Sequence, residues 1–352
     1  MLLLIVALLL KLLSLNAAWV EKYYTYGFYP VVSQVQRVLF GWIPFSIGDM
    51  FYFSATIYLL VEIWQFLGLF RGEKSKRQMG YRVVKKIVLL TLIVYLTFNI
   101  LWGLNYDRQG IAQQLNLNVQ PYSLQELDTL TKTLQLRLNN YAVKIDSVNR
   151  SGLKSNKYLF SQSIDAYQTA NEKYPFLLYK HASIKPSLYS HVGHFFGFTG
   201  YYNPFSGEAQ VKTSVPDFLK PFIVMHEIAH QLGYAKENEA NFVTFLICAG
   251  TQNVEFKYSV YFELFNYALN DINRRDTAIA ASFKQNLHPQ VIKDREELRE
   301  YLQRNANVVE PIMTRFYDQY LKWNSQPKGR RTYNEVITWL IAYMKKYGVE
   351  NI

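Results

Sequence analysis

The five residues His226-Glu227-Ile228-Ala229-His230 have the H-E-x-x-H spacing of a hydrolytic zinc site. Histidines four residues apart lie on one face of a helix, so both imidazoles can bind one metal ion, and the intervening glutamate is offset toward the water on that ion. The pattern predicts His226 and His230 as zinc ligands. It also predicts Glu227 as the general base that accepts a proton from water whose pKa the zinc lowers.

The residues around this motif predict that it lies on a helix. Pro221 suits the first turn, and Gly233 suits the position just after the last turn. The alternative is that two structural histidines happen to lie four positions apart, but the chain has only six histidines and a chance match to the whole motif is rare. Apolar residues between the proline and the glycine repeat at helical spacing: Met225, Ile228, Ala229 and Leu232.

A third ligand is expected from the acidic segment that follows. Residues 237–249 are apolar enough for a second helix, which would fold back against the first after the turn at Gly233. Glu237 and Glu239 are the candidates, and they point roughly 200° apart on a regular helix, so only one can bind the metal. Glu237 is favoured because Asn241 lies one turn further on its face and could hydrogen-bond a ligand. Alternatively, both acids only complement the helix dipole.

The H-E-x-x-H motif followed by E-x-x-A-N resembles the gluzincin metallopeptidases. In that class the glutamate of the second motif is the third zinc ligand, which again implies Glu237. Three longer strings resemble an uncharacterised bacterial membrane family catalogued as domain of unknown function 3810: HEIAHQLGYAKENEANF, GFTGYYNPFSGEAQV and IPFSIGD. The weaker segments YDQYLK and TYNEV extend this likeness over nearly the whole chain. The resemblance implies a gluzincin-like domain, but no substrate or reaction.

Two other classes of zinc hydrolase fit less well. Metzincins share the glycine at Gly233 but have a third histidine where this chain has Lys236. Intramembrane metalloproteases carry the motif within about 20 apolar residues. Here charged residues flank it instead: Lys212, Asp217, Lys220, Lys236 and Glu237. The site is therefore expected in a domain exposed to water.

Three segments near the N-terminus are apolar enough to cross a bilayer as helices: Leu2 to Val20, Phe51 to Phe70 and Ile87 to Leu104. The first could instead be a cleaved signal peptide, although no basic residue precedes its apolar core. Lys11 and Glu62 would lie at similar depths in the first two spans, so we expect them to form an ion pair.

The loop between the second and third spans is strongly basic, and short basic loops stay in the cytoplasm. This orientation places everything after Tyr106 on the outer side. We therefore expect a multi-pass protein of the bacterial inner membrane with an extracytoplasmic catalytic domain. The loop contains Arg71, Lys74, Lys76, Arg77, Arg82, Lys85 and Lys86, against the single acid Glu73.

The predicted organisation is a membrane anchor at residues 1–104 and a zinc hydrolase domain at residues 105–352. Residues 196–213 contain turn residues between short β-favouring stretches and predict a hairpin or small sheet. The fold class is thus mainly α, with three transmembrane helices followed by an α+β zincin-like domain whose small sheet precedes the motif helix. Helices are predicted after a capping box at Ser123 and Glu126 and at residues 157–172, 254–272, 291–323 and 333–347.

The predicted hairpin has two interpretations. It could offer an edge strand along which an extended peptide substrate adds, or it could be a structural turn beside the metal helix. A peptidase also needs a donor for the oxyanion, and the 28 tyrosines of the chain prevent a choice from sequence. The candidates are Tyr202, Tyr258, Tyr261, His288 and Tyr333.

Composition limits the partners. The net charge is +11, but no clustered basic stripe suggests a nucleic-acid partner, and the excess suits a domain near anionic lipid headgroups. Cys248 is the only cysteine, which excludes an internal disulfide and a thiolate metal site. His191 and His194 are interpreted as ordinary polar residues because a glycine separates them in a loop-like segment.

The sequence therefore predicts a membrane-bound zinc hydrolase, most simply a peptidase, with the lipid bilayer and a peptide or protein substrate as partners. The alternative is a non-catalytic membrane scaffold whose metal stabilises the fold. Glu227 argues against the scaffold, because a structural zinc site has no use for a base.

Overall fold

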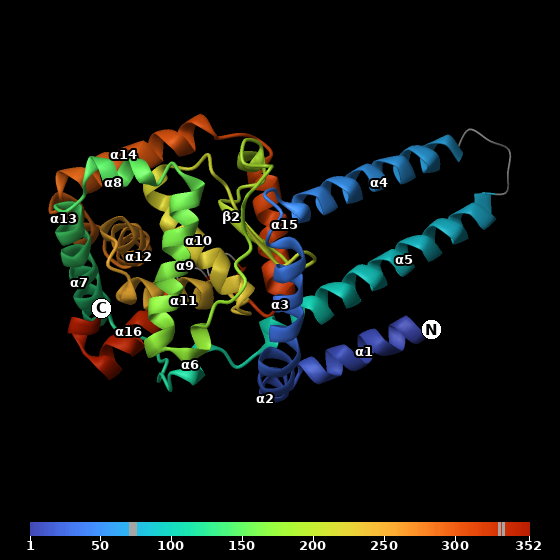
Figure 1. Cartoon of the computed structure of the whole chain (residues 1–352), viewed down its shortest axis with the longest axis horizontal. Coiled ribbons are helices and arrows are strands. Elements are labelled where there is room, and N and C mark those ends of the chain that lie inside the picture. The colour runs from blue at the N-terminus through green and yellow to red at the C-terminus, as the bar shows by residue number, and fades with distance from the viewer. Residues whose placement is uncertain (70–75, 330–331, 333–334) are drawn as a thin grey trace.

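The computed structural model describes residues 1–69, 76–329, 332 and 335–352. Figure 1 shows a rounded, mainly helical body from which three helices of the N-terminal part project on one side. The prediction of a mainly helical chain with one small sheet is confirmed for the residues that the structure describes.

Among the described residues, the N-terminal part provides two candidate membrane spans, or three if a bent pair of helices counts as one span. The segments Ile47–Phe66 and Gly80–Leu101 are long and apolar enough to cross a bilayer. The first predicted span, Leu2 to Val20, is broken in the structure, because its first helix ends at Ser14. It is long enough to cross a bilayer only if Leu2–Ser14 and Ala17–Phe40 are counted together, and a bend of 96° separates these two segments. The elements are α1 (Leu2–Ser14), α2 (Ala17–Trp19), the π-helix η1 (Val20–Phe28), α3 (Tyr29–Phe40), α4 (Ile47–Leu69) and α5 (Lys76–Leu101).

The predicted ion pair between Lys11 and Glu62 is wrong. Glu62 of α4 instead pairs with Lys86 of α5. Because α1 ends at Ser14, Lys11 lies near the body, where it lines a small cavity beside Asn99. Glu62 lies 15 residues into α4, about 22 Å from the start of that helix at 1.5 Å per residue. The depths of the two charges therefore differ.

The body consists mainly of helices that the sequence predicts. The capping box of Ser123 and Glu126 is present at the start of α7. Residues 333 and 334, at the start of the helix predicted at 333–347, lie outside the described residues. The helices are α6 (Ile111–Gln114), α7 (Leu124–Ala142), α8 (Ser147–Gly152), α9 (Asn156–Lys173), α10 (Lys220–Gln231), α11 (Glu237–Gly250), α12 (Val254–Arg275), α13 (Thr277–Gln285), α14 (Pro289–Arg304), α15 (Glu310–Trp323) and α16 (Val336–Tyr347).

The predicted helical run at residues 291–323 is two helices, α14 and α15. Asn307 lies between them, and its side-chain oxygen accepts hydrogen bonds from the N–H groups of Val309 and Glu310. These bonds satisfy N–H groups that a new helix leaves without partners. Asn307 therefore starts a new helix within a segment whose apolar periodicity predicts one continuous helix.

One three-stranded sheet lies beside the helix that carries the H-E-x-x-H motif. Its strands are β1 (Ile184–Pro186), β2 (Gly200–Asn203) and β3 (Glu208–Val211), in the order β1-β3-β2. β2 and β3 form the predicted hairpin, whereas β1, which the sequence did not predict, pairs parallel to β3. β2 is thus an outer strand, and both β2 and β3 contact α10.

α12 is the central helix of the body. Its side chains Phe256, Phe262 and Phe265 are fully buried, and it contacts α7, α10, α11 and α13. Figure 1 shows α12 almost end-on, with α7 and α9 on opposite sides of it. Because α10 and α11 both rest on α12, the core fixes the two helices that carry the predicted ligands.

A buried carboxylate joins the sheet to α4. Glu208 of β3 accepts hydrogen bonds from the backbone N–H groups of Ile47 and Gly48, at 3.1 and 2.7 Å. A negative charge at the N-terminus of α4 is favourable because the helix dipole is positive there. Gly48 allows this approach, since a Cβ at that position would lie 2.5 Å from the side-chain amides of Asn203 and Gln210. Two of the sequence motifs therefore meet at the root of α4.

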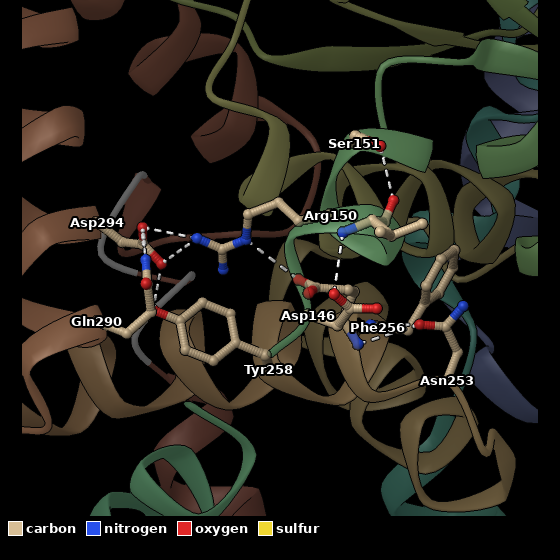
Figure 2. Close-up of polar contacts among 10 residues, drawn as sticks. Asp146, Arg150, Ser151, Asn253, Phe256, Tyr258, Gln290 and Asp294 are labelled. Carbon is tan, nitrogen blue, oxygen red and sulfur yellow. Dashed lines mark hydrogen bonds and ion pairs between the residues drawn. The ribbon is translucent and has the colours of Figure 1, made fainter. Parts of the chain in front are cut away.

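A second charged network ties α8, α12 and α14 together (Figure 2). Arg150 donates to the two carboxylate oxygens of Asp294, at 2.8 and 2.9 Å, and lies 3.3 Å from Glu255. The Tyr258 hydroxyl also donates to Asp294. The side chains of Asp294 and Glu255 are 1% and 2% exposed, so both charges depend on Arg150 for compensation.

Replacement of this arginine should destabilise the body. We expect Arg150→Met to lower the free energy of unfolding by about 3 kcal/mol, because it leaves two buried carboxylates without a counter-charge. Arg274→Met is the matched control, since the Arg274 side chain is 51% exposed and its partner Asp271 keeps an ion pair with Arg275, so the loss is expected to be roughly 0–1 kcal/mol. Chemical unfolding of the full chain in detergent measures both. Equal effects would contradict the prediction.

Candidate metal centre

The three predicted ligands come together in the body. His226 and His230 lie one turn apart on α10, which ends just before Gly233. Gly233 has a φ of +86°, in the left-handed region that glycine adopts without strain, and it reverses the chain. α11 then begins at Glu237 and packs against α10, so that its first carboxylate faces both imidazoles.

The donor atoms fit a single metal ion. The Nε2 atoms of His226 and His230 are 3.0 Å apart, and Oε2 of Glu237 lies 3.1 and 3.6 Å from them. Tetrahedral ligands bound at about 2.0–2.2 Å lie roughly 3.3–3.6 Å from one another, close to these separations. Three buried lone pairs that converge on one point are stable only with a proton or a cation between them. The site is therefore a candidate metal centre.

Burial and hydrogen bonds set the charges of these groups. Burial raises the pKa of Glu237, but hydrogen bonds from both histidines outweigh it, so the pKa lies well below its usual range and the carboxylate is ionised. Burial lowers the pKa of His226. Burial also acts to lower the pKa of His230, but the hydrogen bond and charge of Glu237 raise it to about 9. A metal ion at this point would displace the protons that the imidazole nitrogens share with Glu237.

Both imidazoles are oriented by further hydrogen bonds. Nδ1 of His230 donates to the backbone carbonyl of Tyr234 at 2.7 Å, which leaves Nε2 as the ligand nitrogen. The side chain of Asn241 hydrogen-bonds His226. Asn241 thus hydrogen-bonds one of the candidate ligands, as the sequence predicts.

Glu239 does not join the cluster. Its carboxylate accepts a hydrogen bond from the backbone N–H of Ile111 and is close to Arg108. It approaches the start of α6 so closely that a Cβ on Gly110 would lie 1.8 Å from its Oε1. Of the two acidic candidates, Glu237 is therefore the one that faces the histidines.

Glu227 is buried beside the ligands. β2 passes directly over it, since a Cβ on Gly200 would lie 2.5 Å from Oε1 of Glu227 and 2.9 Å from its Cγ. Oε2 has no hydrogen-bond partner among the described residues. Burial raises the pKa of Glu227 to about 8, and the charge of Glu237 acts in the same direction. A carboxyl group with a raised pKa and an open oxygen is suited to proton transfer.

The N-terminal part of the chain fixes the C-terminal end of α10, the helix that carries both histidines. The carbonyl of Gln231 accepts hydrogen bonds from Tyr29 and Ser33 of α3, at 2.7 and 3.1 Å. The indole N–H of Trp102, just after α5, donates to the carbonyl of His230 at 3.0 Å. These bonds satisfy carbonyls that the end of a helix leaves unpaired. The position of the histidines therefore depends on segments adjacent to the candidate spans.

A cavity of about 660 Å³ opens onto the centre. His226, Glu227, His230 and Glu237 line one part of it. Other walls come from α4, α5, β2 and α15. The cavity thus connects the candidate metal centre with the helices that project from the body.

Of the predicted oxyanion donors that the structure describes, Tyr202 alone lines this cavity. Tyr258 belongs to the Asp294 network, Tyr261 stacks on Tyr141, and His288 caps the N-terminus of α14. Tyr333 lies outside the described residues.

Two tyrosines of α15 were missed from the sequence. Tyr317 and Tyr320 line the cavity, and the hydroxyl of Tyr317 donates to Oε1 of Glu237 at 2.6 Å. Both belong to the YDQYLK segment, and their spacing of three residues on an otherwise amphipathic helix was the available signal. The sequence could not place this helix, because almost 80 residues separate it from the motif.

Comparison with known families agrees with the resemblance of the motifs. A family model described as "Protein of unknown function (DUF3810)" matches residues 24–341, which include the candidate metal ligands, the sheet, α4 and α5. No curated protein and no solved structure gives a significant match. Because the family model covers most of the sequence, the chain belongs to the DUF3810 family.

Proposed function

We propose that this protein is a membrane-anchored zinc-dependent hydrolase of the gluzincin metallopeptidase type. The observation that carries the proposal is the buried carboxyl of Glu227, which lies beside three converging ligands and has one oxygen without a partner in the described part of the chain. A structural metal site does not require such a group. The alternative of a scaffold with a structural metal leaves the position of Glu227 without a role.

The residues of the site suit hydrolysis of an amide bond. When bound, zinc would lower the pKa of water and polarise the substrate carbonyl. Glu227 would accept the proton of the attacking water and transfer it to the leaving amine, while the water oxygen bonds to the carbonyl carbon and the C–N bond breaks. Burial raises the pKa of Tyr320 to about 12, so this hydroxyl stays protonated and can donate to the oxyanion.

β2 supports a peptide as the substrate. It is an outer strand of the sheet, and its residues Gly200, Tyr201 and Tyr202 line the cavity. An extended peptide could add along this strand, which would bring its backbone past Glu227. Of the two interpretations of the hairpin, this arrangement favours an edge strand to which a peptide substrate adds.

The candidate spans support attachment to a membrane, and we propose that the body is extracytoplasmic at the bacterial inner membrane. This orientation rests on the basic loop, of which residues 70–75 lie outside the described residues. The division into an anchor at 1–104 and a hydrolase domain at 105–352 remains a prediction.

Metal content tests the ligand set. We expect the full chain in detergent to bind one zinc ion, and Glu237→Gln to weaken binding by more than about a hundredfold, beyond the roughly 10–100-fold effect of losing an outer hydrogen-bond partner. Glu239→Gln is the matched control and should bind zinc like the wild type, because Glu239 faces α6. Metal analysis with a competing chelator measures both. The reverse order would assign the third ligand to Glu239.

Removal of the base should separate binding from catalysis. We expect Glu227→Gln to retain zinc and its thermal stability but to cleave a peptide library about 10²–10⁴-fold more slowly, because the variant has no group that accepts the proton of water. Loss of zinc in this variant would make Glu227 structural. Activity equal to the wild type would remove the proposed mechanism.

Orientation can be tested with reporters. A periplasm-active reporter fused after Ile352 should be active, and one inserted at Ser75 should be inactive, because the basic residues around Ser75 resist translocation. A cytoplasm-active reporter at the same positions provides the control. The opposite pattern would place the metal centre in the cytosol.

A further inference from the structure

The cavity over the metal centre continues along a membrane helix. Besides Trp102, its walls include Phe98, Val94, Thr91 and Leu90 of α5. Leu90 lies 11 residues before Leu101, the end of α5, which corresponds to about 16 Å along the helix axis. One arm of the cavity therefore reaches from the candidate metal centre to roughly the depth of one bilayer leaflet.

The polarity of the cavity changes along this axis. The end at the body has two imidazoles and two carboxyl groups, whereas the residues of α5 that line the arm are apolar except for the hydroxyls of Thr91 and Tyr95. Tyr52 of α4 and Phe205 after β2 also line the cavity, with their ring centroids 6.4 Å apart edge to face. The cavity thus offers polar groups to one end of a ligand and hydrocarbon to the other.

α15 also indicates that the cavity opens at a bilayer. Its residues Ile312, Phe316 and Trp323 fall within about 40° of one another around the helix and are 54%, 68% and 76% exposed. Tyr317 and Tyr320, on the adjacent side, line the cavity. Figure 1 shows α15 on the side of the body from which α4 and α5 project. The apolar side of α15 is therefore placed to rest in the lipid headgroup region.

We infer that the substrate is an N-acylated peptide embedded in the bilayer. Its single hydrocarbon chain lies along α5 in the membrane arm, and its peptide lies along β2 with the scissile amide at the metal centre. This inference rests on the proposed hydrolytic function and adds the substrate class. Hydrolysis consumes one water, whose oxygen bonds to the carbonyl carbon, and releases the amine with the transferred proton.

The membrane arm suits an acyl chain better than a transmembrane helix. A transmembrane helix would have to unwind before its scissile bond could lie extended along β2. An unwound peptide would leave its N–H and C=O groups without partners beside Leu90 and Val94. A hydrocarbon chain has no such groups to satisfy.

A pair of adjacent substitutions tests the inference. Leu90→Trp narrows the membrane arm, whereas Leu89→Trp introduces the same side chain at the same depth on the opposite side of α5, where Leu89 is 45% exposed. Both variants are reconstituted as full chains with zinc in liposomes. The substrates are mixed-sequence tetrapeptides that carry either an N-dodecanoyl or an N-acetyl group.

We expect the wild type and Leu89→Trp to prefer the dodecanoyl peptides at least tenfold, and Leu90→Trp to lose at least tenfold of that preference. The comparison between the two variants is decisive, because any membrane enzyme meets more of a substrate that partitions into lipid. Equal preferences of the two variants overturn the inference. Cleavage of a transmembrane helix that carries the same tetrapeptides, without cleavage of the dodecanoyl peptides, also overturns it.

Binding distinguishes this inference from the proposed function. The base-deficient Glu227→Gln protein, loaded with zinc, should bind the dodecanoyl peptides in liposomes at least tenfold more tightly than the Glu227→Gln/Leu90→Trp double variant does. This difference without hydrolysis by the wild type would support the acyl-chain site and refute the hydrolase. Hydrolysis with equal binding and equal preference would support the hydrolase and refute the acyl-chain site.

Discussion

The convergence of two imidazoles and one carboxylate on a single buried point is the constraint on which the rest of the structure depends. The three ligand atoms are 3.0 to 3.6 Å apart, and each presents electron density to the others. Such an arrangement is unfavourable unless protons or a cation lie between the atoms, so the surrounding structure must hold it in place. The core helix α12 supports α10 and α11 from one side, and hydrogen bonds to the backbone carbonyl of Tyr234 and with the side chain of Asn241 fix the two imidazoles.

The N-terminal part of the chain is a second support of the same centre. Tyr29 and Ser33 of α3 and the indole of Trp102 bind carbonyl groups at the end of α10. Arg108 adds a further contact, because it donates to the carbonyl of Gly233 at 3.1 Å and pairs with Glu21 of η1. The segments next to the candidate spans are therefore part of the candidate site, and displacement of these helices would move the candidate ligands.

Contacts between the N-terminal part and the body also join sequence motifs that lie far apart along the chain. Ser46 and Gly48 of the IPFSIGD segment meet Glu208 of the GFTGYYNPFSGEAQV segment, and the contact fixes the start of α4 against the sheet. β2 of that sheet passes over Glu227 at a distance that only Gly200 permits. Glu208, at the root of a candidate membrane helix, and the proposed catalytic carboxyl thus lie on or against neighbouring strands of one sheet.

Sequence by itself determined the local features: the helix with the H-E-x-x-H motif, its glycine stop, the second helix from Glu237, the capping box and the β2–β3 hairpin. These follow from periodicity and from short-range hydrogen bonds, which neighbouring residues dictate. Tertiary structure decided the features that depend on contacts between distant segments. It placed Glu237 rather than Glu239 with the histidines, brought Tyr317 to the site, paired Glu62 with Lys86 and ended α1 at Ser14. The apolar content of a segment indicates how long a membrane span could be, but the point at which a helix bends depends on the residues that it packs against. A carboxylate pairs with the cation that lies nearest in space, because the attraction between charges falls with distance.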